Sequence, residues 1–197
     1  MDEDGLRHDH TVSDEWSSPM AAAVGGIRIL IGLAPPAALG AYRRHAQLAE
    51  DFPVTGDSGY DGYAFVAVDD GGGEWPRLVV TQRYAPSGAG FPPGVLYVPE
   101  QRQLFIGAGT RLIAYQARSG QWRRSWEDEA QAGFWSWRQH DDVVIMSAEL
   151  GIAAWRTDGT RLWTTFAEPP WSYRVVAGQI VLDVMGTVRT FDLHRGP

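Results

Sequence analysis

Acidic and histidine side chains are the first candidates for chemistry in this sequence. Glu149 and Asp183 fall on the same face of equivalent strands in two repeated segments, and two carboxylates at a suitable separation can hydrolyse a glycosidic bond. His8–His10 offers two imidazoles for a metal but no third ligand nearby. His140–Asp142 joins two apolar runs and is typical of a solvated turn. We therefore assign no catalytic residue and no metal site, and a small carbohydrate-active hydrolase remains an alternative.

Tryptophan is the unusual feature of the composition, with nine in 197 residues. Alternation along an extended strand would place Trp135 and Trp137 on one face, and likewise Trp171 and Tyr173. A Pro-Pro pair before Trp171 favours an extended loop that presents this ring. Aromatic and arginine side chains are enriched at protein contact sites. The sequence predicts a partner-binding or ligand-binding site made of Trp135, Trp137, Arg138, Glu168, Trp171, Tyr173 and Arg174.

Missing residue types remove whole reaction classes. The chain has no Cys and no Lys, which excludes thiol catalysis, Cys-ligated metals, Schiff-base chemistry and a P-loop lysine. The absence of Lys and Asn also indicates a GC-rich bacterial gene. The formal net charge is -7, but residues 1–62 hold ten acidic residues against four arginines, so the remainder is nearly neutral. We expect no cofactor and no nucleic-acid partner.

The N-terminal third differs from the rest. Residues 1–18 are polar without periodicity, which is typical of a tail. Residues 20–42 form the longest apolar run, but Arg28 and a Pro-Pro pair argue against a membrane span. Translation from Met20 would make this run resemble a signal peptide for export; otherwise the protein is expected in the cytoplasm. We expect residues 1–62 to be a mostly irregular tail or segment, disordered or containing a short helix, or upstream sequence from a misassigned start.

From residue 63 the pattern predicts an all-β domain that extends to residue 197. Apolar runs of five to seven residues alternate with Gly, Pro and Asp, and they fit an antiparallel meander of about 12–13 short strands. Three segments align without gaps: LFIGAGTRLIAY (104–115), VIMSAELGIAAW (144–155) and IVLDVMGTVRTF (180–191). A glycine follows each closing aromatic by four or five residues. The domain therefore contains a repeated supersecondary unit.

Period-two alternation separates the two faces of the first strand of this repeat. Leu104, Val144 and Ile180 begin a face that is apolar in every copy, so this face should be the core. Polar groups occur only on the opposite face. They form a candidate polar face of Ser147, Glu149 and Asp183.

The strings LIAYQARSGQWRRSW and IAAWRTDGTRLWTTF resemble the blade repeat of quinoprotein-like (PQQ-like) β-propellers, over roughly residues 100–197. The resemblance implies four-stranded antiparallel blades. At roughly 40 residues per blade, residues 63–197 supply about three, fewer than propellers use. We expect a partial propeller, one completed by a dimer, or the same meander closed into a sandwich or barrel. The family's quinone chemistry is not expected, because its ligands are not found in this chain.

The sequence favours a non-catalytic β-module of bacterial origin that binds a macromolecule through an aromatic-rich face or loop edge. The expected partner is another protein or a second copy of this chain, with no membrane involved. Three alternatives stay open. They are an immunity protein that neutralises a toxin, the small carbohydrate-active hydrolase, and a sugar or small-ligand binder.

Overall fold

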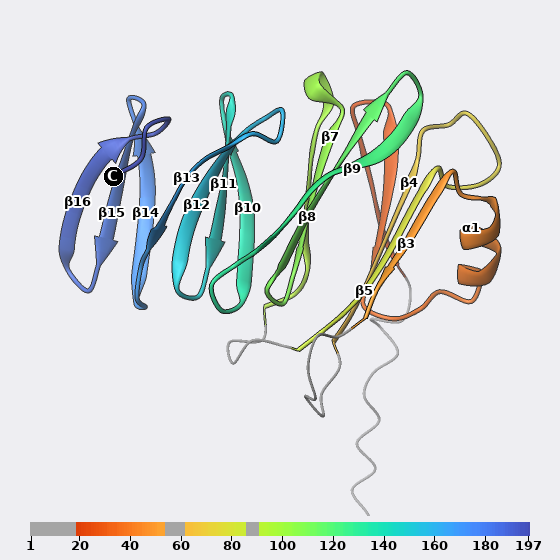
Figure 1. Cartoon of the computed structure of the whole chain (residues 1–197), viewed down its shortest axis with the longest axis horizontal. Helices are drawn as coiled ribbons and strands as arrows, with labels where there is room; N and C mark the ends of the chain where they lie inside the picture. The colour runs from red at the N-terminus through yellow and green to blue at the C-terminus, as the bar shows by residue number, and fades with distance from the viewer. Residues whose placement is uncertain (1–18, 54–61, 86–90) are drawn as a thin grey trace, which may run out of the picture.

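The structure is a computed structural model, and it describes residues 19–53, 62–85 and 91–197. Strands dominate these residues, and the chain is all-β, as the sequence predicts. They form four sheets, numbered I to IV, that lie in a row in chain order, and the described residues form no closed barrel or ring (Figure 1). The two end sheets therefore each have a face that no other sheet covers.

The strands of sheet I depart from chain order, whereas those of the other three sheets follow it. From one edge to the other, sheet I contains β1 (Met20–Val24), β2 (Ile27–Gly32), β4 (Gly62–Asp69), β5 (Leu78–Tyr84) and β3 (Leu48–Phe52). Sheet II contains β6 (Gly94–Val98), β7 (Gln103–Ala108), β8 (Arg111–Arg118) and β9 (Gln121–Glu129). Sheet III contains β10 (Phe134–His140), β11 (Val143–Ala148), β12 (Gly151–Arg156) and β13 (Arg161–Phe166). Sheet IV contains β14 (Trp171–Val176), β15 (Gln179–Val184) and β16 (Thr187–Asp192).

Residues 20–52 are more ordered than the sequence suggested. We expected an irregular segment or a short helix, and they contribute three strands to sheet I as well as α1 (Leu39–His45). β2 pairs antiparallel with β4, and β3 pairs parallel with β5. The apolar run at residues 20–42 shows no period-two alternation where it forms β2, because both faces of this strand are buried. Ile29 is buried on one face and Leu30 on the other. A strand covered on both faces looks like a continuous apolar run.

No helix in the described part of the chain is long and apolar enough to cross a membrane. The run at residues 20–42 instead supplies β1, β2 and the start of α1. α1 packs on the outer face of sheet I, where Leu39, Tyr42 and Ala46 contact buried Phe65 and its neighbours. The outer face of sheet I is therefore covered by a helix (Figure 1).

Three hydrophobic clusters hold the row together, one between each pair of neighbouring sheets. The repeated apolar face faces the preceding sheet each time: Leu104 lies between sheets I and II, Val144 between II and III, and Ile180 between III and IV. The predicted core face is confirmed. In sheets II and III the opposite face is buried as well, because the next sheet packs on it. Phe105 of sheet II contacts sheet III in this way, and Ile145 of sheet III contacts sheet IV.

A repeated contact joins the last strand of one sheet to the third strand of the next. Trp126 of β9 stacks on Trp155 of β12, with ring centroids 5.4 Å apart. Trp163 of β13 packs edge-on against Phe191 of β16, also at 5.4 Å, and its indole donates a hydrogen bond to the Leu193 carbonyl at 2.8 Å. The glycine of the repeat makes room for this tryptophan. A Cβ at Gly196, whose φ is +76°, would lie 2.6 Å from the Trp163 ring.

Candidate functional site

An aromatic cleft of about 360 Å³ lies where the edge strands of sheets III and IV meet. β10 and β11 supply one wall and β14 supplies the other. One further residue comes from the segment just before β6, the edge strand of sheet II. We call this feature the aromatic cleft; it is lined by Phe91, Trp135, Ser136, Arg138, Ser147, Trp171, Ser172 and Tyr173. Five of these belong to the candidate residues of the sequence: Trp135, Arg138, Ser147, Trp171 and Tyr173.

The structure corrects the prediction that Trp135 and Trp137 share a face. Phe134 pairs with Ala148 and Ser136 pairs with Ser147, which leaves Trp135 as the extra residue of a β-bulge. A bulge interrupts the alternation of side chains. Trp137 therefore faces sheet II, where it is 9% exposed and packs against Phe105, Phe134 and Trp155. Trp135 faces sheet IV and lines the cleft.

The aromatic rings of the cleft stack in a continuous series. Phe91 lies against Trp135 at a centroid distance of 5.1 Å, and Trp135 stacks on Trp171 at 5.2 Å with an interplanar angle of 12°. Trp171 in turn stacks on Tyr173 at 6.4 Å. The prediction that Trp171 and Tyr173 share a face is confirmed. Because offset stacking of this kind fixes ring orientation, the wall of the cleft is pre-organised.

Several polar groups in and beside the cleft have no partner. The Trp135 indole nitrogen is buried and forms no hydrogen bond with any residue that the structure describes. The Tyr173 hydroxyl is buried beside Ser147. The Arg138 guanidinium is exposed and makes no hydrogen bond or ion pair within the described ranges. By contrast, the Trp171 indole donates to the Glu149 carbonyl at 3.3 Å. Buried donors without partners are rare in native proteins, and Trp126 and Trp137 also have one between the sheets, so the aromatic cleft is distinguished by the exposed Arg138 beside its rings.

Two titratable groups border this cleft. Burial raises the pKa of Tyr173, which stays neutral, and the Arg138 charge and a Ser147 hydrogen bond oppose this shift. Burial also lowers the pKa of His140, and Arg138 lowers it further, while Asp141 raises it. The His140 ring lies edge-on to Tyr173 at 6.1 Å. The floor of the cleft is therefore uncharged near neutral pH, and Arg138 provides the positive charge.

Four other candidates lie outside the cleft lining. Glu168 is exposed in the loop before β14, which contains a cis Pro169-Pro170 bond. Arg174 is exposed, and alternation along β14 places it on the face opposite Tyr173. Glu149 follows β11 and contributes only its backbone to the contact with Trp171. Asp183 pairs with Ser172 on the outer face of sheet IV and accepts a hydrogen bond from the Gly186 amide at 2.8 Å.

The structure also adds residues that sequence reasoning missed. Phe91 precedes β6 and is distant from Trp135 in sequence, and no periodicity signals their contact. His140 was assigned to a solvated turn, whereas it ends β10 with a buried imidazole Nε2. The FPPG string around Phe91, a proline-fixed aromatic between two strands, was the one available signal.

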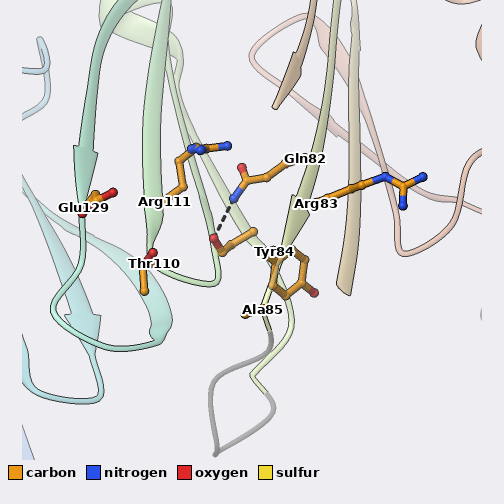
Figure 2. Close-up of a pocket in the computed structure, with 8 residues that line it drawn as sticks. Gln82, Arg83, Tyr84, Ala85, Thr110, Arg111 and Glu129 are labelled. Carbon is orange, nitrogen blue, oxygen red and sulfur yellow. Dashed lines mark hydrogen bonds between the residues drawn. The ribbon is translucent and has the colours of Figure 1, made fainter. Parts of the chain in front are cut away.

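A smaller cavity lies between sheets I and II, and a hydrogen bond between the two sheets crosses it. It measures about 60 Å³ and lies beside Gln82, Arg83, Tyr84, Thr110 and Arg111 (Figure 2). Gln82 points across it and donates a hydrogen bond to the Ala108 carbonyl at 2.7 Å (Figure 2). This bond ties β5 to the end of β7. Among the described residues, no group of three His, Asp or Glu side chains could hold a metal ion.

Comparison with known proteins gives little further information. No protein-family model matches the sequence, and no curated protein does. A solved structure described as "KlHsv2 with loop 6CD replaced by a Gly-Ser linker" is similar with a TM-score of 0.30 and 10% sequence identity. The match covers 51% of this chain and 34% of that one, so the chain spans about a third of its length.

Proposed function

We propose that this protein is a non-catalytic binding module whose aromatic cleft anchors a side chain of a partner protein. The observation that carries the proposal is the combination, in one cleft, of a fixed aromatic wall and an unpaired guanidinium. Interface energy is concentrated in pockets of Trp, Tyr and Arg that exclude water. A cleft of about 360 Å³ is at the small end of ligand sites, large enough for one or two side chains.

The polar groups define the chemistry of the anchor. Arg138 at the rim favours a carboxylate, because a guanidinium and a carboxylate form two parallel hydrogen bonds. The Trp135 indole offers a donor to a backbone carbonyl or a second carboxylate oxygen. The partner therefore presents an apolar or aromatic side chain next to an acidic residue.

A protein partner fits the geometry better than a sugar. Sugar binding by stacking needs an open indole face. The Trp135 ring already has Phe91 against it at 5.1 Å and Trp171 stacked on it at 5.2 Å. The hydrolase alternative has less support still, since Asp183 lies on the outer face of sheet IV and Glu149 follows β11. Neither carboxylate lines the cleft.

We also propose that the four sheets are blades of a partial propeller related to PQQ-like repeats. Sheets II and III each contain four antiparallel strands in chain order, and Trp126 and Trp163 repeat the same contact with the next sheet. No quinone site is part of this proposal. The pairing of β2 with β4 supports a cytoplasmic protein, because cleavage of a signal peptide after residue 40 would remove β1 and β2 from sheet I.

The test compares Arg138 with Arg174, because both arginines are exposed and unpaired with any described residue. A partner is first captured from cells of the source organism with the wild-type protein, then purified, and its Kd is measured by calorimetry. We expect Arg138→Ser to raise the Kd about tenfold or more and Arg174→Ser to leave it unchanged. Trp135→Ala should weaken binding like Arg138→Ser, while Phe166→Ala, which removes a 50% exposed ring outside the cleft, should not.

Two results would contradict the proposal. One is equal affinity of the wild type and the Arg138→Ser and Trp135→Ala variants for the captured partner. The other is saturable quenching of tryptophan fluorescence by a member of an oligosaccharide panel, abolished by Trp135→Ala, which would make the protein a sugar binder.

A further inference from the structure

The outer edge of β16 has no strand beside it among the described residues, and this edge is distinct from the aromatic cleft. Sheets II and III have four strands, and sheet IV has three. β16 pairs with β15 on one side. On its other side the structure shows a single bridge, from Asp192 to Gly196. From Thr187 to Thr190 every residue is exposed.

In sheets II and III the corresponding edge of the third strand pairs with a fourth strand that carries a tryptophan. Trp126 of β9 pairs with Ala114, and Trp163 of β13 pairs with Ala154, each beside a bulge. The repeat aligns Thr190 with these two alanines, because Tyr115, Trp155 and Phe191 are the closing aromatics. An antiparallel strand along β16 would therefore place a residue opposite Thr190 on the outer face of sheet IV.

The exposed side chains along this edge define the strand that would fit. Val188 is 58% exposed on the outer face, near half-buried Val181. Arg189 lies on the opposite face, and its guanidinium has no hydrogen bond or ion pair with a described residue. The edge from Thr187 to Thr190 carries this one charge. A second β16 would bring two such arginines together, so charge complementarity favours an acidic strand over a second copy.

We propose that the free edge of β16 binds an extended segment of a partner protein by β-augmentation. The segment runs antiparallel to β16, with an acidic residue opposite Arg189 and an aromatic residue opposite Thr190 that covers Val188 and Val181. Backbone hydrogen bonds to the edge provide affinity, and the alternating side chains provide specificity. The bound strand gives sheet IV the four-stranded form of sheets II and III.

The chain itself supplies a probe for this edge. β13 pairs with β12 so that Thr164 lies opposite Ala153 and Trp163 opposite Ala154, the counterparts of Arg189 and Thr190. A capped synthetic peptide of residues 159–168 carrying Thr164→Glu would therefore place its carboxylate opposite Arg189 and its indole opposite Thr190. The matched controls are the same peptide with Thr164→Lys, and the Glu peptide with Thr165→Pro, which removes one backbone donor.

Peptide binding is measured by calorimetry, and its location by hydrogen exchange of the β16 amides. We expect the Glu peptide to bind roughly two- to fivefold more tightly than the Lys peptide, the range of an exposed cross-strand charge pair. Arg189→Glu in the protein should reverse this order, and the proline peptide should not bind. Bound peptide should slow exchange at Thr187–Thr190, and Arg138→Ser in the aromatic cleft should change none of these results.

Three results would overturn the proposal. The first is the absence of binding by both the Glu and the Lys peptide. The second is binding that is unaffected by Arg189→Glu or that leaves the Thr187–Thr190 amides unprotected. The third is protection of these amides in the protein alone that rises with protein concentration, which would assign the edge to a second copy. Because Arg138→Ser tests the cleft separately, failure at β16 leaves the proposed function intact, and the reverse also holds.

Discussion

Sheets III and IV are built from the same three-strand unit, yet one is buried on both faces and the other on one. Every residue of β11 is buried, whereas in β15 only Ile180 and Leu182 are. The third strands differ more: β12 is buried from Gly151 to Trp155, whereas in the matching part of β16 only Phe191 is buried and Thr187–Thr190 are exposed. The amino-acid pattern is similar in the two sheets. A neighbouring sheet on the second face makes the difference.

The outer faces of the two end sheets differ in what covers them. The outer face of sheet I is covered by α1, with Tyr42 stacked on Phe65 at 6.1 Å. The outer face of sheet IV carries Val181, Val188, Arg174 and Asp183 with no described residue packed over it. An exposed sheet end with a free edge invites strand addition. The comparison therefore points to sheet IV as the end of the molecule that interacts with other chains.

The largest expected difference between sheets III and IV concerns one pair of aligned residues. Ile152 in β12 is 0% exposed and Val188 in β16 is 58% exposed. We expect Ile152→Ala to lower the free energy of unfolding by about 2–5 kcal/mol, because it leaves a cavity between the sheets. Val188→Ala should change it by less than about 0.5 kcal/mol. Urea denaturation followed by tryptophan fluorescence measures both; comparable losses would mean that sheet IV is covered in solution.

A smaller difference is expected at the repeated glycines. Gly196 and Gly120 have similar φ values, +76° and +74°, so alanine strains the backbone equally at both. A Cβ at Gly196 would meet the Trp163 ring at 2.6 Å, whereas nothing lies within 4 Å of one at Gly120. We expect Gly196→Ala to cost about 1–3 kcal/mol more than Gly120→Ala, the typical penalty of overpacking. Equal melting temperatures of the two variants would show that the Trp163 contact does not hold sheets III and IV together.

The sequence predicted those features that depend on one strand alone. The apolar faces that begin at Leu104 and Val144 follow from alternation, as does the shared face of Trp171 and Tyr173. The repeat could be recognised in the sequence because each copy contains two successive strands within about twelve residues. The contact between Trp163 and Phe191 could not be predicted in this way, because it depends on how sheet III packs on sheet IV.

The missed features depend on partners far away in the sequence. The bulge at Trp135 shows in the pairing of β10 with β11, and no local pattern signals it. β2 and β3 needed β4 and β5 as neighbours before they could be recognised as strands. Glu149 and Asp183 are predicted on the same face of equivalent strands, but these strands belong to successive sheets, and sheet IV separates the face of Asp183 from the cleft. Repetition predicts similar environments, which is different from proximity.

The smallest expected effect is a pH dependence of stability, which tests whether water is excluded from the edge of the interface between sheets III and IV. Burial lowers the pKa of His140 in the folded protein, so the folded state prefers the neutral ring. The stability from this preference is complete above the unfolded pKa of about 6.5 and is lost as pH falls through the folded pKa. We expect the free energy of unfolding to decline on acidification below pH 6.5, and His140→Gln to remove that part of the decline. A His140 pKa of 6.5 or above, measured by NMR titration, would mean that water reaches the imidazole and that this edge of the interface is open.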